Sequence, residues 1–280
     1  MELFDSHAHY NDEKFNNDRE EVIKSVYNSG VTKLINAGYS LQSSKVALDI
    51  ANAHSFMYAT AGISPNDIPG EVDDESLEGK TEAEKKQAFE NSMKIFEEQM
   101  KEIEEIARSK KVVAIGEIGL DYHWNKDNKE LQRTFFAKQI ELANKLNLPI
   151  VIHTREAVMD TLDILKNVAK PKLPGVFHCC PLNVELVKEA LKLGFYISFA
   201  GPVTFKNSKN ATEIAQMVPL DKMLIETDSP YLAPEPVRGT RNDSRNVKYV
   251  LEKLAEFKNV PPEELARQTY KNAETVMQLI

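Results

Sequence analysis

The sequence is poor in cysteine and in long apolar runs, and its 35 basic residues are outnumbered by 43 acidic ones. Its 280 residues include two cysteines, the adjacent pair Cys179 and Cys180, so we expect no disulfide framework and a reducing compartment such as the cytoplasm. No apolar run approaches the roughly 20 residues that span a bilayer, and Met1–Asp5 shows no secretory pattern. Because the formal net charge is -8, we expect no general electrostatic attraction between the whole protein and nucleic acid. A polyanionic partner would need local basic residues or bound cations.

Short β-branched runs alternate along the chain with longer amphipathic stretches. Runs without apolar–polar alternation, such as Val112–Ile115, are typical of parallel strands buried on both faces. The predicted strands lie near Leu3–His7, Thr32–Asn36, Met57–Gly62, Val112–Glu117, Pro149–His153, Gly175–His178, Phe195–Phe199 and Lys222–Glu226. One uninterrupted βα series predicts an α/β protein with a (β/α)8 TIM barrel in a single domain, residues 1–280. A doubly wound sheet is the alternative, but no Gly-x-Gly-x-x-Gly follows the first strand. No obligate protein partner is evident.

The segment Glu71–Lys111, between strands three and four, is longer than one connection requires. Thr81 and Glu84 have the spacing of a capping box, and apolar residues then recur every three or four positions. These residues are Phe89, Met93, Phe96, Met100, Ile103 and Ile106. The pattern predicts an extended amphipathic helix whose apolar stripe either packs on the barrel or binds a partner.

Histidines and carboxylates gather at the predicted strand ends. In a (β/α)8 barrel the functional side chains converge at the carboxyl ends of the strands. Four of the six histidines and two carboxylates lie there, namely His7, His9, Glu117, His153, His178 and Asp228. Each residue alone also fits a hydrogen-bonded core position or a turn cap. Together they suit two divalent ions such as Zn²⁺, Mn²⁺ or Ni²⁺, or Mg²⁺ if carboxylates and water dominate. Two such ions activate water and stabilise developing charge, so the pattern predicts metal-assisted hydrolysis.

Six segments, in order along nearly the whole chain, carry a family resemblance. They are Asp5–His9, Gly116–Tyr122, Pro149–Ala157, Phe195–Gly201, Ile225–Leu232 and Pro236–Asn242. These segments resemble the signature segments of the TatD family of metal-dependent hydrolases. The resemblance implies a (β/α)8 metallohydrolase that is usually described as a deoxyribonuclease, often a 3′-to-5′ exonuclease that needs a divalent cation.

The resemblance also implies roles for the gathered side chains. His7 and His9 would bind one ion together with Asp228, and the histidines of strands five and six would bind a second. Glu117 would bridge the two ions. A metal-activated water would attack the phosphorus, with Asp228 orienting the water or taking its proton. Asp228 and Glu117 are therefore the predicted catalytic residues, with DNA as the substrate.

Two positions depart from the family pattern. Ser64 stands where the family commonly has a histidine, in a Gly-x-His-Pro motif, so we expect a changed substrate contact there. Cys180 stands where the family usually has an aromatic residue, which would alter the shape of the pocket. A thiolate ligand from Cys180 is an alternative that would bias the site toward Zn²⁺.

Several arginines and one aromatic segment are candidates for substrate contacts. Arg155 follows a proposed ligand, and Arg238 and Arg241 lie in the last loop of the predicted barrel. Arginine suits bidentate contact with phosphate, although solvated surface charge is the alternative. Tyr122 opens the segment Tyr122–Trp124, which either stacks on a base or covers the top of the barrel.

Two other functions remain open from the sequence. An amidohydrolase that opens an amide, ester or lactone often uses a carboxylated lysine as the bridge, whereas strand four offers Glu117. A non-catalytic metal-binding or DNA-binding protein would not require an intact set of six ligands.

Overall fold

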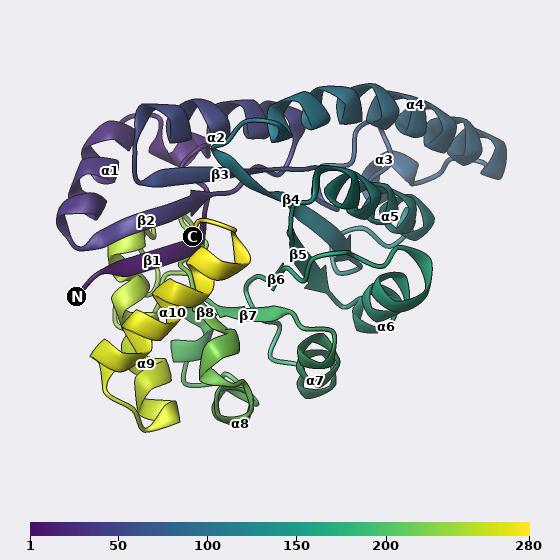
Figure 1. The fold of residues 1–280 in the computed structure, drawn as a ribbon. Coiled ribbons are helices and arrows are strands. Elements are labelled where there is room, and N and C mark those ends of the chain that lie inside the picture. Colours follow the sequence, from purple (N-terminus) through teal and green to yellow (C-terminus); the bar gives the residue numbers. More distant parts are fainter.

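The eight strands form one parallel sheet that curves into a nearly closed barrel, with the helices outside it (Figure 1). The computed structural model describes all residues 1–280. The strands are β1 (Leu3–Ala8), β2 (Val31–Asn36), β3 (Met57–Ala61), β4 (Val112–Asp121), β5 (Ile150–Arg155), β6 (Val176–Phe177), β7 (Tyr196–Phe199) and β8 (Met223–Ile225). Each strand pairs in parallel with the next one in the sequence. The predicted (β/α)8 fold is confirmed.

The first and last strands meet where the barrel closes. Ala8 forms an isolated parallel bridge with Ser229, and the backbone N–H of Asp228 donates to the carbonyl of His7 at 2.9 Å. These bonds place residues that lie more than 200 positions apart in the sequence side by side at one rim of the barrel.

The helices connect the strands and cover the outside of the barrel. They are α1 (Arg19–Asn28), α2 (Leu41–Ala53), α3 (Asp74–Leu77), α4 (Glu82–Ala107), α5 (Lys129–Leu146), α6 (Val158–Asp163), α7 (Val184–Lys192), α8 (Ala211–Met217), α9 (Val247–Lys258) and α10 (Pro262–Val276). None of them is both long enough and apolar enough to cross a membrane.

Helix α4 is the extended segment between strands three and four, and it lies along the outside of the barrel (Figure 1). Thr81 and Glu84 form the predicted capping box at its start. Phe96 and Ile103 in its apolar stripe are completely buried, and the Phe96 ring stacks on Phe135 of α5 at 3.7 Å between centroids. Packing against the barrel therefore accounts for the stripe.

The two ends of the barrel are built differently. At the amino end, Phe4 and Ile35 from the strands pack against Ala273, Val276 and Met277 of α10 and its C-terminal turn. Burial of this apolar cluster is a main stabilising contribution at that end. The histidines and carboxylates predicted as metal ligands lie instead at the carboxyl end, which is where barrels of this type place their functional groups.

Strand β4 continues beyond the predicted end at Glu117, and β5 continues beyond His153. The pairing of the two strands slips between Ile115 and Ile118. A Cβ atom on Gly119 would lie 1.9 Å from the carbonyl oxygen of His153, and Gly119 has φ +143°. Only glycine permits this close approach, which brings Glu117 and His153 to the same part of the barrel.

Candidate metal centre

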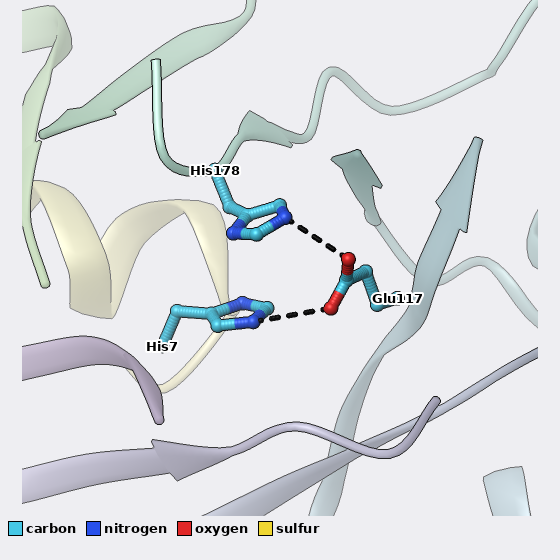
Figure 2. A group of neighbouring side chains, drawn as sticks. All are labelled: His7, Glu117 and His178. Atoms are coloured by element: carbon cyan, nitrogen blue, oxygen red, sulfur yellow. Dashed lines mark hydrogen bonds and ion pairs between the residues drawn. The ribbon is translucent and has the colours of Figure 1, made fainter. Parts of the chain in front are cut away.

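Six polar side chains converge at the carboxyl end of the barrel. One lies in β1 and one just after it, one each comes from β4 and β5, and two come from the residues that follow β6 and β8. They are His7, His9, Glu117, His153, His178 and Asp228. Figure 2 shows Glu117 beside the stacked rings of His7 and His178, with one carboxylate oxygen directed at each ring. The structure thus brings together all six residues predicted as ligands.

Glu117 divides the cluster into two parts. Its Oε2 atom lies 3.4 Å from Nε2 of His7 and 3.7 Å from Nε2 of His9. Its Oε1 atom lies 3.0 Å from Nδ1 of His153 and 3.1 Å from Nε2 of His178. Each carboxylate oxygen therefore faces one histidine pair, which is the geometry that a bridging ligand requires.

The first half-site consists of His7, His9, Asp228 and the Oε2 atom of Glu117. His9 lies two residues after His7, one position past the end of β1, and continues the alternation of the strand, so both side chains leave it on the same face. Their Nε2 atoms are 3.1 Å apart. The Oδ1 atom of Asp228 lies 3.2 Å from Nε2 of His9 and 3.7 Å from Nε2 of His7.

The second half-site consists of His153, His178 and the Oε1 atom of Glu117. The Nδ1 atom of His153 lies 3.4 Å from Nε2 of His178. The ring of His178 also stacks on that of His7, with 4.0 Å between centroids, so the two half-sites are in contact.

Two carboxylates that the sequence analysis missed stand behind the second half-site. Oδ2 of Asp121 lies 2.9 Å from Nε2 of His153, and Oε1 of Glu226 lies 3.4 Å from Nδ1 of His178. A carboxylate on the far nitrogen fixes the orientation and tautomer of a ligating histidine and raises its basicity. Spacing offered a signal, because Asp121 lies four residues after Glu117 on the same strand and thus on the same face.

Burial and charge act against one another in this cluster. Burial raises the pKa of Glu117, but the charge of His178 and the hydrogen bond with His153 hold that pKa well below its usual value. Burial lowers the pKa of His153, but its hydrogen bonds with Asp121 and Glu117 raise it to about 9. The buried carboxylates therefore stay ionised and need positive charge beside them, which protons or cations can supply.

The donor atoms fit divalent cations. Ligand atoms at about 2.1 Å from one ion are separated from each other by roughly 3.0 to 3.4 Å. The histidine nitrogens of the two half-sites are separated by 3.1 Å and 3.4 Å. No lysine or arginine lies within 4.0 Å of either Glu117 or Asp228, so no side-chain cation other than histidine neutralises them. Imidazole and carboxylate donors of this kind suit borderline metal ions.

Cysteine does not contribute to the cluster. The groups of side chains whose donor atoms converge contain histidine, glutamate and aspartate alone. Burial raises the pKa of the Cys180 thiol to about 12. A thiolate ligand from Cys180 is therefore not supported.

Two of the predicted substrate contacts lie outside the ligand cluster and are buried. The side chain of Tyr122 is 8% exposed, and its hydroxyl donates to Asp160 at 2.6 Å. Ser64 is 4% exposed and donates to Oδ2 of Asp67 at 2.6 Å. Both hydroxyl groups thus have partners within the protein.

The three predicted arginines differ in how they are held. Arg241 makes a bidentate pair with Asp18, at 2.9 and 2.6 Å. Arg238 lies 4.0 Å from Glu235. Arg155 has no carboxylate within 4.0 Å, and its guanidinium lies over the ring of Trp124 at 5.4 Å. Arg155 is therefore the arginine of this set that is free to contact an anion.

Residues 4–278 match the family described as TatD related DNase. The chain belongs to the TatD family. It is 39% identical over 277 residues, 99% of each chain, to an uncharacterized metal-dependent hydrolase of Bacillus subtilis, YabD. It is 36% identical over 275 residues to one from Buchnera aphidicola, covering 97% of this chain and 94% of that one. The family predicted from the signature segments is confirmed, and the chain is a metal-dependent hydrolase.

Solved structures agree with the fold. The TatD homologue YJJV of Escherichia coli superimposes with a TM-score of 0.78 at 24% identity, covering 98% of this chain and 97% of that one. An uncharacterized amidohydrolase of Saccharomyces cerevisiae gives a TM-score of 0.83 at 19% identity, covering 99% of both chains. TatD-family and amidohydrolase barrels thus share this architecture.

Proposed function

We propose that the chain is a deoxyribonuclease that hydrolyses DNA phosphodiester bonds with two divalent ions, Mg²⁺, Mn²⁺ or Zn²⁺. The observation that carries the proposal is the position of Glu117, with one oxygen toward each histidine pair. The family description supports DNA as the substrate. The proposal includes one hydrolase domain over residues 1–280 and 3′-to-5′ exonuclease action on single strands or ends.

The residues that would hold the ions follow from the two half-sites. His7, His9 and Asp228 would hold one ion, the remaining two histidines would hold the other, and Glu117 would contact both. Bound divalent ions supply Lewis-acid stabilisation of the charge that develops on the phosphate oxygens and lower the pKa of water.

Asp228 is the residue that we assign to proton transfer. Burial raises its pKa, but the hydrogen bond with His9 and the charge of that ring hold the pKa below its ordinary value, so the carboxylate is ionised. Its backbone is anchored by the N–H bond to the carbonyl of His7 at 2.9 Å. An ionised, anchored carboxylate can orient the attacking water and accept its proton. Arg155 would neutralise a phosphate of the substrate.

The test is the degradation of single-stranded oligonucleotides labelled at the 5′ or the 3′ end, with and without added Mg²⁺, Mn²⁺ or Zn²⁺. We expect a 5′-labelled strand to shorten stepwise in the presence of an ion, and a chelator to stop the reaction. The absence of cleavage with every ion would contradict the proposal. Hydrolysis of a lactone or amide in place of DNA would favour an amidohydrolase activity.

A further inference from the structure

Trp124 is an exposed aromatic residue beside the second half-site. It is the only tryptophan of the chain, and 61% of it is exposed. The ring of His123 meets it edge-on at 4.8 Å between centroids. An indole held open to solvent in this way is unusual for a residue that serves packing alone, because burial of a large aromatic side chain is favourable.

Arg155 lies over the indole and has no acidic partner. Its guanidinium is 5.4 Å from the ring centroid. Arg133 of α5 is instead paired with Asp160 and Asp163, each at 3.1 Å. The Arg155 guanidinium is thus free to contact an anion. It lies beside an aromatic ring at the end of β5, the strand that carries the proposed ligand His153.

Asp121 ties this pair to the second half-site. Its Oδ1 atom accepts the backbone N–H groups of His123 at 2.9 Å and Trp124 at 3.2 Å. Its Oδ2 atom lies 2.9 Å from Nε2 of His153. Asp121 and Arg155 are also register partners in the β4–β5 ladder. One carboxylate therefore positions both a proposed metal ligand and the segment that carries the exposed indole.

We propose that Trp124 and Arg155 form a subsite for one unpaired nucleotide of the substrate. The nucleobase stacks on the indole, and the guanidinium contacts the phosphate of that nucleotide. This inference rests on the proposed nuclease function and narrows its substrate class. A base inside a duplex is stacked on both faces by its neighbours and does not offer a free face to a protein ring, so the subsite selects single strands and frayed ends.

The burial of Tyr122 shows why Trp124, and not Tyr122, is the candidate for stacking on a base. Tyr122 is two positions before Trp124, but its ring is buried and its hydroxyl is bonded to Asp160. Trp124 is therefore the residue of the Tyr122–Trp124 segment that presents an open aromatic face.

The test uses the fluorescence of the single tryptophan. Asp228→Asn protein with Mg²⁺ is titrated with a single-stranded oligonucleotide, and binding is followed in parallel by the anisotropy of a label on the DNA. We expect saturable quenching of Trp124 emission, little quenching by an abasic strand, and weaker binding of a blunt duplex. Base–aromatic stacking of ordinary strength predicts that Trp124→Ala lowers affinity about 10-fold or more, and Trp124→Phe less.

Matched controls come from the opposite end of the barrel. Tyr27 is 50% exposed at the end of α1, and Arg267 lies in a groove with Met1 and Glu2. Tyr27→Ala and Arg267→Ala should bind DNA as the parent does, whereas Arg155→Ala should bind less tightly.

Unchanged emission on DNA binding, together with full affinity in Trp124→Ala, would overturn the subsite while leaving the nuclease proposal intact. Equal affinity for single strand and duplex would overturn the selection of an unpaired base. Failure of the wild-type chain to bind or cleave any DNA would overturn both proposals.

Discussion

The two half-sites differ in the groups that face the ring nitrogens pointing away from the proposed ions. In the second half-site, Nε2 of His153 is hydrogen-bonded to Asp121, and Nδ1 of His178 lies 3.4 Å from Oε1 of Glu226 without a hydrogen bond. In the first, Nδ1 of His9 contacts the backbone carbonyl of Ala37 at 3.1 Å, and Nδ1 of His7 has no hydrogen-bond partner. The far nitrogens of the second half-site therefore lie beside carboxylates, whereas those of the first do not.

This difference has a chemical consequence. A carboxylate behind a ligating imidazole makes the ring a stronger donor and fixes its rotation, whereas a backbone carbonyl fixes rotation with less effect on basicity. The first half-site gains a carboxylate as a direct donor instead, since Asp228 faces both of its histidines. We therefore expect substitutions to act on the two half-sites separately, except at Glu117.

The largest effect is expected at Glu117, which belongs to both half-sites. Glu117→Ala should lose both ions and lower turnover by more than about 10⁴-fold, because the charge stabilisation that the ions supply is worth several kcal/mol. Elemental analysis of the dialysed protein measures the ion content. Two ions remaining per chain would show that Glu117 is not a bridge.

The next largest effect is expected at Asp228, which belongs to the first half-site alone. Asp228→Asn should retain the ion of the second half-site and lower turnover by about 10²- to 10⁴-fold, the usual contribution of a positioned acid or base. His153→Ala should show the converse loss, of the second ion. Isothermal titration with Mn²⁺ distinguishes the two variants. Loss of both ions in either one would mean that the half-sites act as a single unit.

A smaller effect is expected from the carboxylates behind the second half-site. Asp121→Asn and Glu226→Gln should each weaken binding of one ion about 10- to 100-fold and leave the other ion unaffected. Asp163→Asn, which changes an exposed carboxylate paired with Arg133, is the matched control. Equal weakening of both ions would remove the distinction between the half-sites.

The smallest effect is expected at Arg241. Its guanidinium is already engaged by Asp18, and an exposed pair of this kind contributes little to stability. Arg241→Ala should change DNA affinity by less than about 3-fold, whereas Arg155→Ala should reduce it more, since Arg155 has no competing carboxylate. Fluorescence anisotropy with a labelled single strand compares the two. A larger loss at Arg241 would place the phosphate contact on the opposite side of the cluster.

Much of the fold follows from local patterns in the sequence. Strand and helix periodicity predicts the βα series, and the Thr81–Glu84 capping box predicts the start of α4. Closure of the barrel explains why His7 and Asp228, far apart in sequence, lie together. The six clustered side chains could be predicted because strand ends in such a barrel share one rim.

The rest depends on contacts that no local pattern encodes. The slip between β4 and β5 extends β4 to Asp121 and sets that carboxylate behind His153. The pairing of Arg241 with Asp18 joins residues 223 positions apart. Whether an arginine is free or engaged is decided by the packing of loops, so sequence alone could not separate Arg155 from Arg241.

The central claim is that Glu117 separates two ion positions. Anomalous scattering from crystals soaked in Mn²⁺ tests it most directly. We expect two peaks about 3.5–4 Å apart, one on each side of the Glu117 carboxylate, with the His7–His9 pair at one peak and the His153–His178 pair at the other. A single peak, or a pair of peaks that Glu117 does not join, would contradict it.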